Sequence, residues 1–137
     1  MDPLSVTASI IAILQLTTAL TAYLNDVKHA TAEQRKVAVE ASNLYGLLTT
    51  LRYRVEDART DDEWFNQVKL LGMANGPLDQ FKHILEQIVG NVTASGMRER
   101  VKSTVTWRWT KTEVKEALQQ MERLKTLVNI ALTNDIL

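Results

Sequence analysis

Few of the side chains that perform chemistry stand at spacings that could form a site. His29 and His83 are far apart, and neither has a second histidine at the spacing of a zinc site. The densest ionisable cluster is an acidic run made of Glu56, Asp57, Asp61, Asp62 and Glu63. This run lacks the glycine and the regular oxygen ligands of a calcium loop, so a solvated loop between helices explains it better. We predict no metal site.

Nucleophilic and phosphate-binding motifs are also absent from the sequence. There is no cysteine, which excludes thiol catalysis and disulfides and is typical of a reducing compartment. No phosphate loop or dinucleotide fingerprint occurs. Serine and threonine are frequent, but no histidine lies near one in the sequence to suggest a triad. We therefore expect no enzyme, no catalytic residue and no cofactor.

The composition is that of one globular domain over residues 1–137. Hydrophobic residues make up 45% and charged residues 23%, close to the averages of folded domains. The chain carries 16 basic and 16 acidic residues, so its formal net charge is zero. Because dedicated nucleic-acid binders are usually basic, we expect no nucleic-acid partner.

One stretch, residues 97–111, is basic and carries two tryptophans. Lipid headgroups attract such residues, because tryptophan suits the interface and lysine and arginine suit anionic phospholipids. A solvated face, with the tryptophans packing the last helix against its neighbours, and base stacking on a nucleic acid remain open alternatives. The possible headgroup contacts are Arg98, Arg100, Lys102, Trp107, Arg108, Trp109 and Lys111.

The N-terminal stretch has no ionisable side chain from Pro3 to Asn25, a run of 23 residues. This is about the length of a membrane-spanning helix. Pro3 suits a first helical turn, so we predict a helix from Leu4 to about Leu24. Apolar residues surround this helix without forming one stripe, which is typical of a helix buried in a core or in lipid.

Three interpretations of this helix differ in how it meets a membrane. A secretory signal is disfavoured, because Asp2 replaces the usual positive start and no small-residue cleavage site follows. A permanent anchor is disfavoured by seven hydroxyl or amide side chains, which offset the small gain from each Leu or Ile. A core helix in the resting fold is favoured, and it does not exclude a lipid-facing state. The seven polar residues are Ser5, Thr7, Ser9, Gln15, Thr17, Thr18 and Thr21.

The rest of the chain predicts helices. Thr31 and Gln34 form a capping box before an amphipathic helix that runs to about Asp57. Its apolar stripe is predicted from residues at three- and four-residue spacing, namely Val37, Ala41, Leu44, Leu48, Leu51 and Val55. Asp61 or Asp62 caps a short helix with Trp64, and Pro77 starts another helix after a turn. The last helix spans about Thr112 to Thr133. We predict an all-α fold of four main helices with one short insert, packed as a bundle.

Four blocks, in order along nearly the whole chain, resemble the HeLo-like domain, the N-terminal domain of fungal STAND proteins. They are "MDPLSVTASIIAILQL", "EASNLYGLLTTLRYRVEDA", "NGPLDQFKHILEQI" and "KTEVKEALQQMERLKTLVNIALTNDIL". The resemblance implies a four-helix-bundle-like domain with an additional short helix, similar to the N-terminal bundle of the mixed-lineage kinase-like pseudokinase of necroptosis. It implies that Leu44, Leu48, Leu51, Leu118, Leu124 and Val128 hold the bundle.

The same resemblance implies an executioner of fungal programmed cell death, of the heterokaryon-incompatibility or innate-immunity type. Such a domain rests in the cytoplasm, self-associates when an upstream NLR-type or amyloid-signalling partner or a C-terminal regulatory domain activates it, and then permeabilises the plasma membrane. Its N-terminal helix would act on the membrane. The implied membrane-active residues are Leu4, Val6, Ile10, Ile11, Ile13, Leu14, Leu16, Leu20 and Leu24.

Some relatives have glycine-rich N-terminal helices, whereas the first glycine here is Gly46. Close packing in lipid would therefore use the small residues Ala8, Ser9, Ala12, Ala19 and Ala22. The end at "TNDIL" leads us to expect that the domain is the N-terminal part of a longer protein. The alternative function is a helical interaction and oligomerisation module of a fungal NLR-like receptor, without membrane activity.

Overall fold

The computed structural model describes residues 3–26, 31–87 and 111–133, and these residues form an all-α fold. Helix α1 spans Pro3–Asp26 and α2 spans Ala32–Glu56. A short helix α3, Glu63–Val68, continues into a 3₁₀ turn η1, Lys69–Gly72. Residues 77–87 are helical, and α5 spans Lys111–Thr133. No strand occurs within these ranges.

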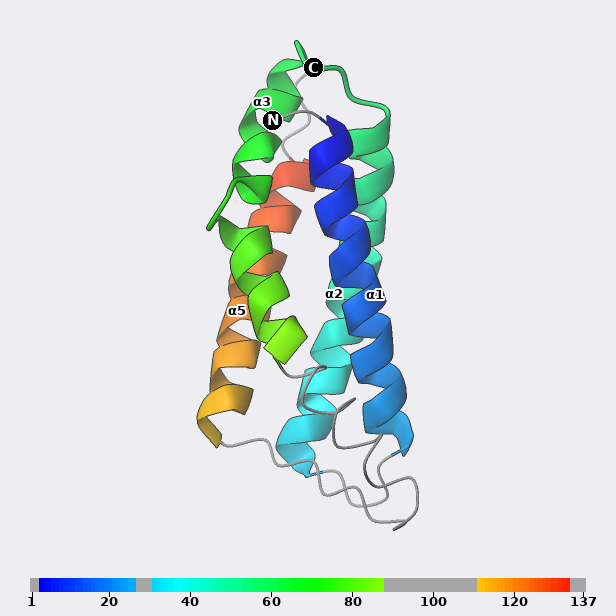
Figure 1. Cartoon of the computed structure of the whole chain (residues 1–137), viewed down its shortest axis with the longest axis vertical. Helices are drawn as coiled ribbons and strands as arrows, with labels where there is room; N and C mark the ends of the chain where they lie inside the picture. The colour runs from blue at the N-terminus through cyan, green and yellow to red at the C-terminus, as the bar shows by residue number, and fades with distance from the viewer. Residues whose placement is uncertain (1–2, 27–30, 88–110, 134–137) are drawn as a thin grey trace.

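The long helices lie side by side along the long axis of the molecule (Figure 1). Helix α2 makes extensive contacts with both α1 and α5. The α3 and η1 segment lies at the end of the molecule where α1 begins and α5 finishes. The chain runs along α1, returns along α2, runs back through residues 77–87 and returns along α5. This places α2 between two neighbours and leaves its third side outside their contacts.

The predicted start signals form as expected. The Thr31 side chain accepts a hydrogen bond from the Gln34 backbone N–H at 3.1 Å, and the Gln34 side-chain oxygen accepts one from the Thr31 N–H, also at 3.1 Å. Asp62, rather than Asp61, caps α3 by accepting from the Trp64 N–H. In the turn before residue 77, Asn75 has φ 62°, a left-handed conformation that asparagine tolerates. These caps fix where α2 and α3 begin.

One apolar stripe on each helix forms the core. The predicted stripe of α2 is buried at all six positions, Val37, Ala41, Leu44, Leu48, Leu51 and Val55. On α5 the buried stripe is Val114, Ala117, Met121, Leu124 and Val128, whereas Leu118 is only half-buried. Ala117 and Leu118 both fit the three- and four-residue spacing between Val114 and Met121, but at 3.6 residues per turn Ala117 lies nearer the centre of the buried stripe than the predicted Leu118. The short helices and residues 77–87 add Trp64, Phe65, Val68, Leu71, Leu78, Phe81 and Leu85.

Polar contacts join α5 to α2 and α3. Near the C-terminal end of α5, the Trp64 indole N–H donates to the Ala131 carbonyl at 2.8 Å, and Arg54 Nη1 donates to the Leu132 carbonyl at 3.0 Å. The Arg54 guanidinium also lies 4.3 Å from the Trp64 ring centroid. The last carbonyls of a helix have no partner within the helix and carry its negative dipole end, so both donors stabilise it.

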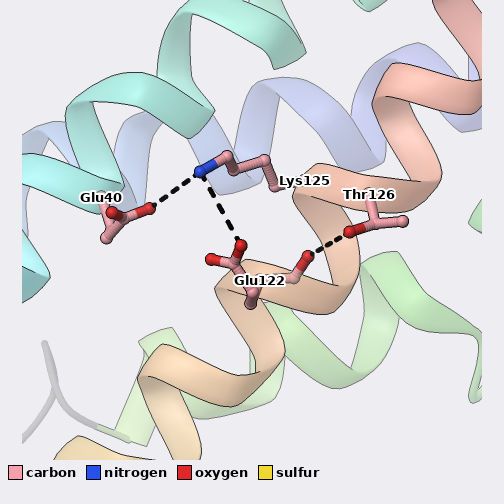
Figure 2. A network of polar contacts seen from close by, with 4 residues as sticks. All are labelled: Glu40, Glu122, Lys125 and Thr126. Atoms are coloured by element: carbon pink, nitrogen blue, oxygen red, sulfur yellow. Dashed lines mark hydrogen bonds and ion pairs between the residues drawn. The ribbon is translucent and has the colours of Figure 1, made fainter.

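Further along the same interface, Lys125 Nζ lies 3.4 Å from Glu40 on α2 and 3.9 Å from Glu122 on its own helix (Figure 2). The Glu122 carbonyl also accepts a hydrogen bond from the Thr126 hydroxyl. The Lys125 and Glu40 side chains are partly exposed, and such ion pairs contribute at most about 1 kcal/mol. The pair therefore helps to define the orientation of α5 relative to α2 and contributes little to stability.

Trp64→Phe should lower the free energy of unfolding by about 1–2 kcal/mol, because it removes the indole donor to Ala131 and part of a buried ring. Urea denaturation followed by circular dichroism measures the change. Tyr53→Phe is the matched control, since Tyr53 is exposed and the change should stay within about 0.5 kcal/mol. Equal effects of the two substitutions would contradict the role given to the indole.

Candidate functional site

The candidate site is helix α1, which has two different faces. Its buried face carries Val6, Ile10, Ile13, Leu14, Leu20 and Leu24, together with Thr7 and Thr17. Its opposite face is exposed at Leu4, Ser5, Ala8, Gln15, Thr18, Ala19 and Ala22. The expectation that α1 is apolar and buried all round is therefore wrong, because the side chains that face solvent are mainly small or polar.

The exposed face of α1 has no charge. From Pro3 to Asn25 no side chain is ionisable, whereas nearly a quarter of the whole chain is charged. Surface helices of soluble domains normally place charged residues on the solvent side. Among the described helices, α1 has the length and apolar composition needed to cross a membrane, a property that core helices and signal sequences share.

The predicted membrane-active residues lie in three environments. Val6, Ile10, Ile13, Leu14, Leu20 and Leu24 pack in the core. Ile11 and Leu16 are half-buried at the edges of the packed face. Leu4 is 79% exposed at the start of the helix. The structure thus places six of these nine side chains where lipid cannot reach them unless α1 separates from the other helices.

Several polar side chains of α1 are already bonded to their own helix. The hydroxyls of Thr17 and Thr18 donate to the carbonyls four residues earlier, at 2.7 and 2.9 Å, and Ser9 donates to Ser5 at 3.2 Å. These bonds do not depend on the other helices, so they can persist if α1 leaves them. They lower the desolvation penalty that the polar residues of α1 would add in lipid.

Thr7 is the exception among the polar residues of the buried face. It is 7% exposed, and its hydroxyl has no hydrogen-bond partner. A buried hydroxyl without a partner destabilises the packed state by about 1–3 kcal/mol. From the sequence, Thr7 was identified only as a polar residue. Its position three residues before Ile10 and ten before Thr17 places it on the same side of the helix as these buried residues, and this spacing could have predicted its burial.

Helix α1 is attached to the other helices mainly by apolar burial. No ion pair can hold residues 3–25 through their side chains, because none of them is ionisable. The α2–α5 contact, in comparison, includes the Lys125–Glu40 ion pair and the hydrogen bond from Arg54 to Leu132. A hollow of about 220 Å³ between α1 and α2 is lined by Thr18, Thr21, Ser42 and Tyr45.

The predicted headgroup contacts are mostly outside the described residues. This applies to Arg98, Arg100, Lys102, Trp107, Arg108 and Trp109. Lys111 is the first residue of α5 and is exposed. Within the described ranges, no group of three or more histidine or acidic side chains is arranged to hold a metal ion.

The small residues that sequence reasoning proposed for close packing lie mainly on the solvent side of α1. Ala8, Ala19 and Ala22 are exposed, and Ser9 and Ala12 are half-buried. They are therefore accessible in the packed state, before any separation of α1.

Comparison of the chain with protein-family models, with curated proteins and with solved structures finds no match.

Thr7→Val should raise the free energy of unfolding by about 1 kcal/mol, because it replaces an unpartnered buried hydroxyl with a methyl group of similar size. Thr17→Val is the matched control in the same helix. It removes a hydroxyl that is bonded to the Ile13 carbonyl, so it should lower the unfolding free energy by about 0.5–1 kcal/mol. Urea denaturation of both variants checks the opposite signs, and a destabilised Thr7→Val would contradict the assignment.

Proposed function

We propose that this chain is a membrane-targeting cell-death effector domain of the HeLo-like type, with a four-helix-bundle-like fold and a short additional helix. It rests in the cytoplasm, self-associates on activation and permeabilises the plasma membrane through α1. The observation that carries the proposal is the charge-free helix α1, which is attached through one face and presents an equally uncharged face to solvent.

The dimensions of α1 suit this role. Its 24 residues extend about 36 Å at 1.5 Å per residue. The hydrocarbon core of a bilayer is about 30 Å thick, so the helix can span it with some tilt. Apart from the groups at its two ends, the backbone N–H and C=O groups of α1 hydrogen-bond within the helix, as a lipid environment requires.

The proposed exchange moves α1 from one apolar environment to another. The buried side chains of α1 pack on apolar neighbours at rest, and lipid tails would surround them with similarly apolar groups. The Thr7 hydroxyl has no partner in the core and would find none among lipid tails, so it does not oppose the exchange. The apolar area that α1 uncovers on the remaining helices opposes it, so the exchange needs an activating event that covers that area or brings copies together.

Activation by an upstream NLR-type receptor, an amyloid-signalling partner or a C-terminal regulatory domain is part of the proposal. So is contact of Lys111 and the preceding basic residues with anionic phospholipids. The charge of Lys111 faces solvent at the start of α5, where it is accessible to a headgroup. The proposal assigns no catalytic residue, cofactor or nucleic-acid partner.

The second candidate function is a helical interaction module without membrane activity. The exposed Val39, Tyr45 and Tyr53 on α2 favour it, because they offer apolar contact area while α1 stays packed. The two functions differ in whether α1 must leave the other helices, and the following experiments test that step.

Gln15→Glu should reduce dye release from anionic liposomes at least tenfold at pH 7. The substitution is isosteric, lies on the exposed face near the middle of α1, and introduces the only charge between Pro3 and Asn25. A charged side chain at the centre of a membrane helix costs about 2.5–3.5 kcal/mol. The protein would carry a C-terminal tetrameric coiled coil to impose self-association.

The matched control is Gln119→Glu, which makes the same change at an exposed position of α5. This variant should release dye like the unsubstituted protein, and both variants should show unchanged circular dichroism. Equal release by Gln15→Glu and Gln119→Glu would refute insertion of α1.

A cleavable crosslink between α1 and α2 should block dye release. Thr21→Cys and Ser42→Cys place two thiols around the same hollow, and the natural chain has no cysteine to compete. A disulfide-containing bis-maleimide would join them, and a reductant would cleave the spacer in the same sample. We expect little release before cleavage and full release after it, because only a free α1 can enter the bilayer.

Undiminished dye release by the crosslinked protein would contradict the proposal. It would show that α1 either permeabilises the membrane while still attached to α2 or has no part in permeabilisation. Each single-cysteine variant treated with the same reagent is the control, since it carries the modification without the bridge.

A further inference from the structure

We propose that the outer side of α2 pairs with the same side of α2 in a second copy of this chain, with the two helices antiparallel and related by a two-fold axis near Gly46. This inference concerns a different surface from α1 and does not depend on membrane activity. The surface is a line of residues at alternating spacings of four and three, here named the outer seam: Arg35, Val39, Ser42, Gly46, Thr49 and Tyr53.

The outer seam has the spacing of a helix-pairing surface and is mostly uncovered in the monomer, although Ser42 at its edge lines the hollow shared with α1. Alternate steps of four and three residues place side chains on one side of a helix, as in the seam of a coiled coil. In this structure Val37, Ala41, Leu44, Leu48, Leu51 and Val55 form the stripe that packs in the core. The outer seam lies on the other side, where five of its six residues are exposed and Thr49 is half-buried.

Two large apolar side chains of the seam face solvent. Val39 and Tyr53 are each 59% exposed, and they stand seven residues on either side of Gly46. In an antiparallel pair centred on Gly46, Val39 of one copy lies opposite Tyr53 of the other. Each dimer thus buries two such apolar pairs, which the monomer leaves in water.

Gly46 stands in the middle of a 25-residue helix, where glycine is about 1 kcal/mol less favourable than alanine. A Cβ added to Gly46 would meet no atom within 4 Å, so nothing inside the monomer requires a glycine. Its backbone angle is also not in the left-handed region. A close approach of a second helix explains why a side chain is absent there.

The charges at the two ends of the seam are complementary under the same symmetry. Arg35 stands eleven residues before Gly46 and Asp57 eleven residues after it. Lys36 and Glu56 stand ten residues before and after it. An antiparallel pair therefore brings Arg35 and Lys36 of each α2 near Glu56 and Asp57 of the other, whereas a parallel pair would place like charges together. Within the monomer Glu56 also pairs with Arg52 at 2.9 Å, so the new contact adds to that ion pair.

The hydroxyls within the seam are compatible with this contact. Thr49 donates to the Tyr45 carbonyl at 2.8 Å, and Thr50, beside the seam, donates to the Gly46 carbonyl at 3.1 Å. Their hydrogen-bonding needs are met within α2, so pairing does not leave them unsatisfied. From Ala41 to Leu51 the helix has no charged side chain that pairing would desolvate.

Sedimentation equilibrium of the full chain without lipid tests the dimer. We expect a reversible monomer–dimer equilibrium that Gly46→Gln weakens at least tenfold, because the added side chain separates the helices. Asn129→Gln, at an exposed position of α5, should leave the equilibrium unchanged. A monomer at all concentrations, or equal dimerisation of both variants, would overturn the proposal.

Introduced cysteines test the antiparallel register, since the natural chain has none. Under mild oxidation, Gly46→Cys should form a covalent dimer at least tenfold faster than Asn129→Cys on α5. Val39→Cys should crosslink to Tyr53→Cys in a mixture but only slowly to itself. Rapid self-crosslinking of Val39→Cys would indicate a parallel pair and overturn the proposed geometry.

Charge reversal distinguishes specific pairing through the outer seam from nonspecific association. The double variants Arg35→Glu with Lys36→Glu, and Glu56→Lys with Asp57→Lys, should each dimerise at least tenfold more weakly. An equimolar mixture should recover dimers, because each basic end then meets an acidic end. Failure of the mixture to recover would refute the charge pairing. Because no lipid is present, these results are distinguishable from failure of the membrane function.

Discussion

The burial of one stripe on α2 organises the described structure. The six residues from Val37 to Val55 are all buried and join α2 to α1 on one side and to α5 on the other. Burial of a large aliphatic side chain contributes about 1.5–3 kcal/mol, so this stripe is a main source of stability. Because α2 contacts both neighbours through one stripe, a third side of this helix stays uncovered. The middle of α2, from Ala41 to Leu51, has no charged residue, which is unusual for an exposed side of a helix.

The attachments to α2 differ in kind on its two sides. Toward α5, apolar burial is supplemented by hydrogen bonds from Arg54 and Trp64 to the last carbonyls of α5 and by the Lys125–Glu40 pair. Such bonds depend on distance and angle, so they define one geometry. Toward α1 the contact is mainly apolar, and burial is non-directional. The α2–α3–α5 portion is therefore the part of the fold with the more precisely defined arrangement, and α1 is the element that can exchange one apolar environment for another.

The sequence was sufficient to predict the features that depend on local chemistry. The capping box at Thr31, the cap in the acidic run and the stripe of α2 follow from spacings within a few residues, and the structure confirms them. The sequence was insufficient where distant segments meet. The contact of Arg54 and Trp64 with the end of α5 joins residues more than 60 positions apart, and no local pattern indicates it.

Helix α1 shows a second reason for failure. Its apolar residues include Ile11 and Leu16, which are only half-buried at the edges of the packed face, while Thr7 and Thr17 are buried within it. The periodicity of hydrophobic residues therefore does not reveal that α1 has one buried and one exposed face. Its polar residues are small and uncharged, so they can occupy either face. The membrane role of α1 was proposed from the absence of charge and from the family resemblance, and it stays a prediction.

The membrane-active surface proposed on α1 and the outer seam of α2 belong to different helices, and this separation links the two proposals. The outer seam of α2 does not include the buried stripe that holds α1, so pairing through the seam does not require α1 to move. Conversely, departure of α1 leaves the seam intact, provided that the α5 contacts preserve α2. A dimer joined through α2 would then bring two copies of α1 to one membrane surface with no new contact between them. The second helix would enter at a high effective concentration, as in any linked pair of binding elements.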